Sequence, residues 1–220
     1  RLSAQVAYVM AVYRHRPQTI AALEKMVDAY AEERSSEIGE VGSDCRIVGA
    51  RFIREVRIGN GVEIDGASIL ENATLCDGAR VGVDVKAYDL IAAEGSVIDN
   101  GSIVERCFVG ESCRLDKGFT AAESLFFANS HCENGEAASI FAGPYTVSHH
   151  KSSLLIAGMF SFFNAGSGSN QSNHLFKSGA VHQSVHLRGC KFASSAYIMS
   201  PALEGAFTMV MGHHSYHHDT

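Results

Sequence analysis

The chain carries two hydrophobic periods, one before about residue 45 and another after it. Downstream of residue 45, aliphatic residues recur at every sixth position, and turn-forming pairs such as Asn60-Gly61 and Asp77-Gly78 stand at fixed offsets from them. A first ladder runs through Ile58, Ile64, Leu70 and Cys76, and a second through Ile91, Val97, Ile103, Val109, Leu115, Ala121 and Phe127. A fixed short period of this kind indicates stacked structural repeats.

A six-residue period lets each short strand point one large side chain into a narrow core. Each coil buries its apolar row only against its neighbours, so stability accumulates by stacking. Strands of a sandwich would instead alternate every two residues, with irregular turn spacing. The pattern therefore predicts an all-β fold, a single-stranded left-handed parallel β-helix of hexapeptide repeats. The register slips by three residues between the two ladders, which predicts a loop or a distorted coil around 82–90.

Residues 1–36 follow a helical period instead. Two apolar runs are separated by Pro17, which ends the first helix and fits the first turn of the second. The first run is Leu2, Val6, Val9, Met10 and Tyr13, and the second is Ile20, Leu23, Val27 and Tyr30. We expect a short helical pair over 1–36 and the β-helix over 37–220. Because two such helices cannot bury themselves alone, they should pack on the following domain or on another subunit.

The ladder is regular over 58–127 and irregular after about residue 140. Residues 140–190 are rich in Phe, Ser, Gly, Asn and His, and the six-residue phase survives there only in fragments. The Gly-Ser stretch at 166–170 indicates a loop or an irregular corner, with a flexible linker as the alternative. Functional sites tend to lie where local consistency fails, so we expect function in this region.

Composition narrows the choice of partners and compartment. The net charge is −6, and the one Lys/Arg cluster is at 14–16, which argues against nucleic acid as a partner. No apolar run reaches the roughly 18 residues that span a bilayer, and no signal-peptide pattern is present. The six cysteines include no Cys-x-x-Cys pair. We therefore expect reduced thiols that fill core space in a cytoplasmic protein.

Histidine is the most informative residue type. Ten of the eleven histidines follow residue 130, and none lies in the regular ladder. Imidazole exchanges protons near neutral pH and is the commonest metal ligand. With three hexapeptides per coil, His131 would stack on His149, and Asn164 on His182. Stacked polar residues of this kind would form a groove between coils or subunits in which a small ligand could bind.

Two segments are candidate sites. Residues 144–153 offer a base, hydroxyls and a cation, and residues 164–174 offer side chains suited to hydrogen-bonding a sugar or phosphate. The Gly-Ser stretch is not a P-loop, because it lacks that motif's Lys spacing. Three histidines meeting at a subunit boundary would suit zinc, so the metal content stays open. The candidate catalytic bases are His149, His150 and His174. The candidate cofactor-binding residues are Lys151, Asn164, Ser167, Asn170, Gln171, Asn173 and His182.

The hexapeptide ladder resembles the bacterial transferase hexapeptide superfamily. That superfamily includes sugar and serine acyltransferases, C-terminal domains of sugar-nucleotide pyrophosphorylases, and gamma-class carbonic anhydrases. More narrowly, four segments look like a bacterial family of uncharacterised β-helix proteins that bear names such as sugar nucleotidyltransferase or acyltransferase. These segments are 1–8 (RLSAQVAY), 13–17 (YRHRP), 141–151 (FAGPYTVSHHK) and 164–174 (NAGSGSNQSNH). Members of that family are longer, which implies that this chain is an interior piece.

The resemblance implies acyl transfer to a sugar or nucleotide-sugar, with a histidine as general base and acetyl-CoA or another acyl-CoA as donor. A histidine of 149–174 would be that base. Two alternatives stay open: a non-catalytic β-helix that scaffolds an assembly or binds a ligand, and a metal site like that of the gamma-class carbonic anhydrases. The sequence leaves open whether the chain is an enzyme. Hexapeptide proteins are frequently trimers, so we expect a homo-oligomer.

Overall fold

The computed structural model describes residues 3–174, 184–216 and 220, and the chain forms two compact units, Arg1–Gly39 and Glu40–Thr220. The first unit contains α1 (Ala4–Val12) and α2 (Pro17–Arg34). Ser3 caps α1 by accepting a hydrogen bond from the backbone N–H of Val6, and Pro17 occupies the first turn of α2, where its missing N–H costs nothing. The predicted helical pair is therefore confirmed. Neither described helix is long and apolar enough to cross a membrane.

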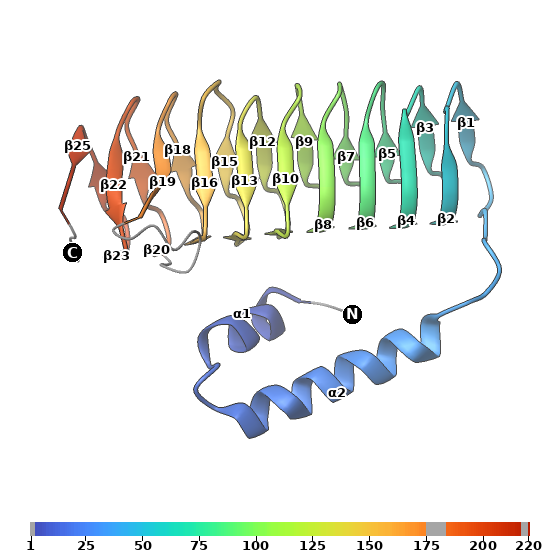
Figure 1. The fold of residues 1–220 in the computed structure, drawn as a ribbon. Coiled ribbons are helices and arrows are strands. Elements are labelled where there is room, and N and C mark those ends of the chain that lie inside the picture. Colours follow the sequence, from blue (N-terminus) through green and yellow to red (C-terminus); the bar gives the residue numbers. More distant parts are fainter. Residues whose placement is uncertain (1–2, 175–183, 217–219) are drawn as a thin grey trace. The chain divides into compact units, whose positions relative to one another are not determined.

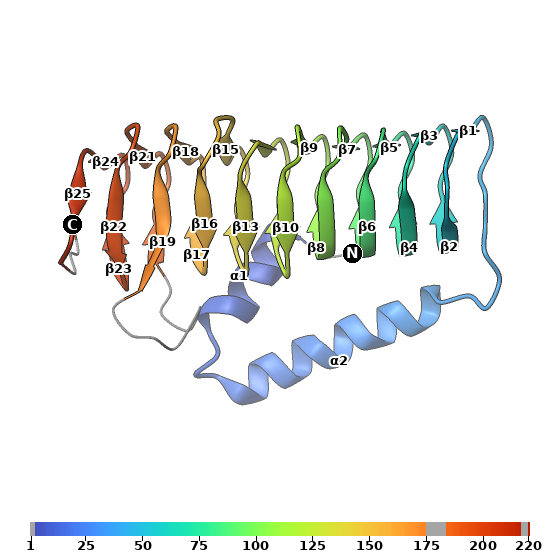
Figure 2. The same ribbon diagram turned by 45° about the horizontal axis from the view of Figure 1, so that its top comes forward.

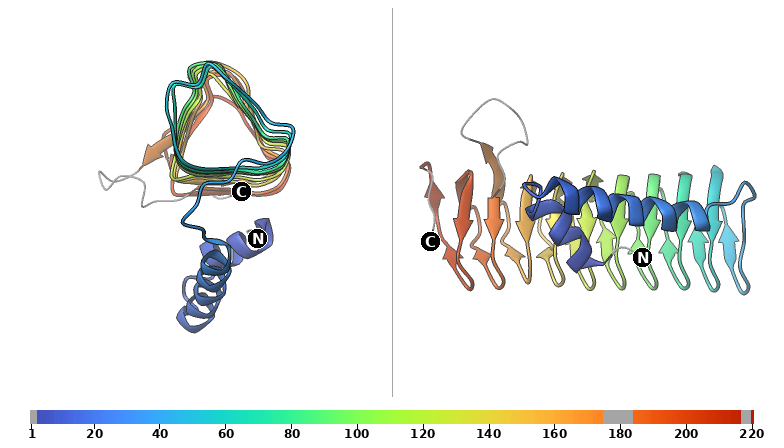
Figure 3. Two further views of the ribbon diagram at one scale, coloured as in Figure 1. Left: turned by 90° about the vertical axis from the view of Figure 1, so that its right-hand side faces the viewer. Right: turned by 90° about the horizontal axis from the view of Figure 1, so that it is seen from below.

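The second unit is a parallel β-helix, as predicted. Its coils follow one another along a single axis (Figures 1 and 2), and each coil is triangular when viewed end-on (Figure 3). Every pairing between its described strands is parallel and joins neighbouring coils, and the strands form a ten-stranded first sheet and a fifteen-stranded second sheet. Because the second sheet bends at a corner, it supplies two of the three sides.

The first sheet forms one side and contains, in order, β1 (Arg46–Val48), β3 (Glu63–Asp65), β5 (Arg80–Val81), β7 (Val97–Ile98), β9 (Arg114–Asp116), β12 (His131–Glu133), β15 (Val147–Ser148), β18 (Asn164–Ala165), β21 (Lys191–Phe192) and β24 (Met209–Val210). In the second sheet, four long strands turn the corner: β2 (Ile53–Ile58), β4 (Ile69–Leu75), β6 (Lys86–Ala92) and β8 (Ile103–Val109). One side continues with β10 (Thr120–Ala122), β13 (Glu136–Ala138), β16 (Leu154–Ile156), β19 (Asn170–His174), β22 (Tyr197–Ser200) and β25 (His213–His214). The other continues with β11 (Leu125–Phe126), β14 (Phe141–Ala142), β17 (Gly158–Phe160), β20 (Ser184–His186) and β23 (Ala202–Glu204).

Each regular coil is one residue shorter than the three hexapeptides that the sequence predicted. The register shows this, because Arg46 pairs with Glu63, and Glu63 pairs with Arg80. Two sides of the triangle therefore use six residues and the third uses five. The inward positions run through Ile58, Ile64, Leu70, Leu75, Val81, Ala87, Ala92, Ile98 and Val104, all buried.

The shorter side corrects the predicted ladders. Leu75 fills the core position that the six-residue period assigned to Cys76, and it is 1% exposed. Ile91 and Ile103 of the second ladder lie on the outside instead, with 48% and 40% of their surface exposed. The loop predicted around 82–90 is also wrong, because β5 and β6 pair there in unbroken register with the coils on either side.

Left-handed backbone turns form the corners of the coil. At the corner that leads into the first sheet, the residues at these turns include Asp44, Gly61, Gly78, Gly95, Ser112 and Asn129, all with positive φ. Glycine reaches this conformation freely, and Asp and Asn reach it at small cost. The turn residues noticed in the sequence are therefore the corners of the triangle.

Polar side chains enter the interior of the later coils, alongside apolar ones such as Phe160 and Phe192. The inward position of the first sheet is Leu115, then Cys132, then Ser148 in successive coils, and all three are fully buried. All six cysteines are free, and burial raises the pKa of Cys113 to about 12. On another side, His186 Nδ1 lies 2.5 Å from Glu204 Oε2, and both side chains are at most 1% exposed. The rings of Phe160, Phe163 and Phe192 surround His186, with centroids within 5.3 Å.

This buried pair generates a stability prediction. Glu204→Ala leaves a buried polar imidazole without its partner and should destabilise the β-helix by about 1–3 kcal/mol. The double variant His186→Leu/Glu204→Met replaces the pair by apolar side chains of similar size and should match or exceed the wild-type stability. Urea unfolding measures both midpoints. A double variant as unstable as the single one would contradict this account of the pair.

Candidate functional site

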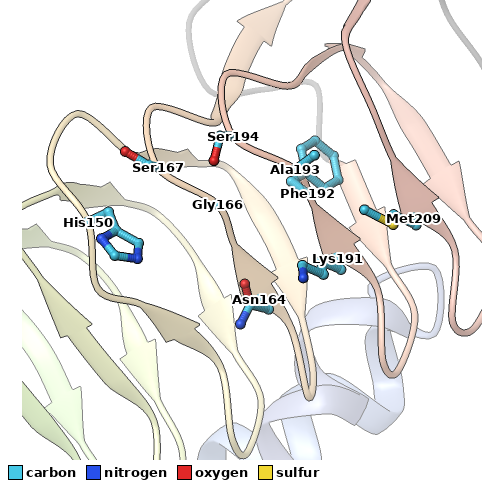
Figure 4. Close-up of a pocket in the computed structure, with 9 residues that line it drawn as sticks. All are labelled: His150, Asn164, Gly166, Ser167, Lys191, Phe192, Ala193, Ser194 and Met209. Carbon is cyan, nitrogen blue, oxygen red and sulfur yellow. The ribbon is translucent and has the colours of Figure 1, made fainter.

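A groove of about 630 Å³ lies on the outer face of the first sheet, across strands β18, β21 and β24 (Figure 4). Outward side chains of the paired strands form its middle: Asn164 lies opposite Lys191, and Lys191 lies opposite Met209. The corner that follows these strands supplies its polar end. The groove is lined by His150, Asn164, Gly166, Ser167, Lys191, Phe192, Ala193, Ser194 and Met209.

Small residues keep the floor of this groove open. A Cβ on Gly166 would lie 2.5 Å from the carbonyl oxygen of Phe192, so only glycine lets the two coils approach as closely as they do. His150, Asn164 and Lys191 are exposed around this floor. The groove therefore offers an imidazole, an amide and an ammonium group to a ligand, which is a set that can hydrogen-bond hydroxyls and attract negative charge.

Next to His150, a chain of polar contacts runs across three coils. Lys117 Nζ lies 2.6 Å from Glu133 Oε2, and Glu133 Oε1 lies 2.8 Å from Nε2 of His131. The His131 ring meets the edge of the His149 ring, with 4.2 Å between centroids. The amide of Asn134 donates a hydrogen bond to the backbone oxygen of His149. This arrangement holds the backbone that presents His150 to the groove.

These contacts favour a charged Glu133 carboxylate and a neutral His149 imidazole. Burial of Glu133 opposes its ionisation, but hydrogen bonds from Lys117 and His131 outweigh that effect and lower its pKa. Burial also lowers the pKa of His149, and the nearby His131 lowers it further. His149 is therefore held in the uncharged form near neutral pH, which is the form of imidazole that can accept a proton.

The structure brings some of the predicted site residues together and separates others. His150, Asn164 and Ser167 line the groove. His149 lies beside it, in contact with His131 as the sequence indicated. The sheet register nevertheless pairs His131 with Val147, because that coil is shorter than three hexapeptides.

The remaining candidates lie elsewhere. Lys151 is exposed at the turn after His150, and Asn170 accepts a hydrogen bond from the backbone of Ser172. Gln171 is buried inside the β-helix. Asn173 and His174 belong to strand β19, and only their backbone is described. His182, and with it the predicted stacking on Asn164, lies outside the described residues.

Sequence reasoning missed the groove residues contributed by the later coils, above all Lys191 and Met209. Lys191 pairs with Asn164 across a coil much longer than the regular ones, so no regular period connects them. Glu133 was missed too, although its position two residues after His131 on a strand was a usable signal, because both side chains of such a pair lie on one face. Within the described residues, no group of three or more His, Cys, Asp and Glu side chains is placed to hold a metal ion.

The lowered pKa of His149 generates a pH prediction. The folded state binds fewer protons than the unfolded chain, whose histidines titrate near 6.5. The free energy of unfolding therefore keeps its full value with respect to His149 above about pH 6.5. It decreases as the pH falls through the folded-state pKa of His149. Between pH 7.5 and 5.5, the wild type should lose more unfolding free energy than His149→Gln. Urea unfolding at both pH values and NMR titration of the imidazole would check this, and equal losses in the two proteins would count against it.

Comparison with known proteins adds a family but no activity. No curated protein matches the chain. One family matches along the whole length, residues 1–220, and it is described as a domain of unknown function, DUF4954. This match covers the helical pair, the regular coils and the coils that carry the groove. The chain therefore belongs to the DUF4954 family.

Proposed function

We propose that the chain is a transferase that moves an acyl group to a hydroxyl or amine of a sugar or nucleotide-sugar. The observation that carries this proposal is the exposed His150 at the end of a groove that also presents Asn164 and Lys191. A general base must reach the proton that it removes, and an imidazole opening into a ligand-sized groove meets that requirement. The resemblance to hexapeptide transferases supports the same chemistry.

In this mechanism His150 takes the proton from the acceptor as the acceptor oxygen or nitrogen attacks the thioester carbonyl of an acyl-CoA. The new C–O or C–N bond forms, the C–S bond breaks, and the proton passes from His150 to the departing thiolate. Asn164 and Ser167 supply amide and hydroxyl groups that orient the sugar, because a few well-placed polar groups fix a ligand in its groove. His149 and His131 hold the turn on which His150 stands.

The test is a transfer assay with acetyl-CoA and a panel of amino- and hydroxy-sugars, followed by release of free thiol. His150→Ala should lower kcat by about 100-fold or more with a small change in KM, as expected when a general base is removed. The matched control is His213→Ala, an exposed histidine on the second sheet. The proposal fails if no sugar is acylated, or if the two variants lose activity equally.

A second candidate is a non-catalytic scaffold that assembles through its first coil. Ile47 and Ile53 pair in register with the core residues Ile64 and Leu70, yet 42% and 38% of their surface is exposed. Their strands, β1 and β2, are end strands of the two sheets, with residues 40–42 paired to β2 at Ile58. Such edges with exposed apolar side chains can pair with another β-structured layer.

The scaffold candidate predicts a homo-oligomer that depends on this edge. Ile47→Lys should reduce the sedimentation coefficient of the protein at micromolar concentration, because a lysine at an apolar edge opposes pairing. The matched substitution Ile91→Lys changes an equally exposed isoleucine away from the edge and should have no effect. A wild type that sediments as a monomer, or equal effects of both substitutions, would contradict the candidate.

A further inference from the structure

The corner before the first sheet changes character in the C-terminal coils. Backbone hydrogen bonds stack its residues from coil to coil, and each has a positive φ. The early corner residues are Asp, Gly, Ser or Asn, but three later ones are Tyr145, Phe162 and Phe207, with φ of 60°, 47° and 63°. A side chain with a Cβ is strained in this conformation, and bulky residues rarely adopt it.

Burial does not offset that cost. Tyr145 and Phe162 are each 50% exposed, and Phe207 is 70% exposed. Glycine or asparagine would relieve the strain, as they do at the same corner of earlier coils. Exposed aromatic side chains held in a strained conformation are a pointer to function, because strain of this kind concentrates at ligand-binding sites.

The positively charged Arg188 lies close to two of the three aromatic rings. Tyr145 and Phe162 stack with 4.9 Å between centroids. The guanidinium of Arg188 lies 5.9 Å from the centre of the Phe162 ring and 5.5 Å from that of Phe207, within the range of cation–π attraction. We call these four residues the aromatic corner. In successive coils the corner positions are Tyr145, Phe162, Gly189 and Phe207, and Arg188 fills the place beside the glycine.

The aromatic corner borders the groove. Asn164 follows Phe162 by two residues, and Met209 follows Phe207 by two residues, so the groove begins where the corner ends. Its outward residues extend over β18, β21 and β24, with His150 one coil earlier. At about 4.8 Å per coil, these four coils span about 14 Å. That length accommodates several linked sugar rings rather than one.

Residues 137–203 also differ from the rest of the chain in their charged side chains. No Asp or Glu occurs from residue 137 to residue 203, and the acid that ends this stretch, Glu204, is buried. Lys151, Arg188 and Lys191 are exposed in the same coils. On the same sheet face in earlier coils, Arg46 and Arg80 are each paired with a carboxylate. Within the described residues, neither Arg188 nor Lys191 has such a partner, so both are available to an anionic ligand.

We propose that the aromatic corner and the groove together bind an anionic oligosaccharide several rings long, lying along the β-helix axis. The proposal rests on the proposed function, whose acceptor it specifies. The aromatic rings contact the apolar faces of the sugars, while Asn164 and Ser167 hydrogen-bond their hydroxyls. Arg188 and Lys191 bind the acidic groups, which are carboxylates or phosphates.

Calorimetric titration of the whole chain, without any acyl donor, tests the proposal with three probes. These are a galacturonic acid pentamer, a mannose pentamer with a terminal phosphate, and the same mannose pentamer without phosphate. At least one acidic pentamer should bind at least tenfold more tightly than the neutral one, and added salt should weaken it. The stronger acidic probe identifies the acidic group. Equal affinity for all three, or binding of none, would overturn the proposal.

Two sets of variants separate the cations from the rings. Arg188→Gln/Lys191→Gln should weaken binding of the acidic pentamer about tenfold or more and flatten its salt dependence, because each substitution removes a charge-assisted hydrogen bond to the ligand. Arg80→Gln, on the same sheet face but in an early coil, is the matched control. An equal loss in Arg80→Gln would overturn the proposal.

For the rings, Phe162→Asn/Phe207→Asn should keep or raise the urea midpoint, because asparagine adopts the backbone conformation of the corner easily. The same variant should bind the acidic pentamer more weakly. Unchanged affinity in this folded variant would exclude the aromatic corner from binding.

These binding measurements can fail independently of the proposed transferase function. Tight binding without acyl transfer would count against the transferase alone, whereas transfer to single sugars without pentamer binding would count against the anionic oligosaccharide alone.

Discussion

Hydrogen bonding from one coil to the next is the constraint on which this structure depends. Many strands are only two or three residues long, and each finds its hydrogen-bond partners only in neighbouring coils. The chain must therefore return to the same place in every coil, which requires a left-handed turn at each corner and a side chain of suitable size at each inward position. The C-terminal coils keep this pairing around buried polar groups, as the pair of His186 and Glu204 shows, although β19 and β22 shift register between Asn170 and Asn173.

The fold was predictable because its two signals are local and repeated. An inward aliphatic residue and a turn residue recur in each coil, and the helical pair has its own period and Pro17 as punctuation. The register was harder to predict, because one side of the triangle takes five residues. Outward aliphatic residues such as Ile91 and Ile103 also fall six positions apart from other aliphatic residues, so the period alone cannot tell the inside from the outside.

The candidate site was predictable only where its residues are close in sequence. His150, Asn164 and Ser167 come from adjacent coils and meet in one groove. Lys191 joins them across a long and irregular coil, so only the folded chain reveals it. Gln171 resembles a ligand-binding residue by type, but the alternation of its strand turns it inward. The aromatic corner has no sequence signature at all, because its meaning comes from the backbone conformation of residues such as Phe162.

The separation of charge along the chain has a consequence at long range. Residues 40–136 of the β-helix carry 17 acidic and 9 basic residues, whereas residues 137–220 carry 2 acidic and 4 basic residues. Since the coils follow one another in chain order, this difference becomes a lengthwise electric dipole of the β-helix. An approaching polyanion is repelled by the early coils and drawn to the late ones, so the field turns it toward the C-terminal coils before contact. Such a field acts on the rate and orientation of encounter more than on the strength of the final complex.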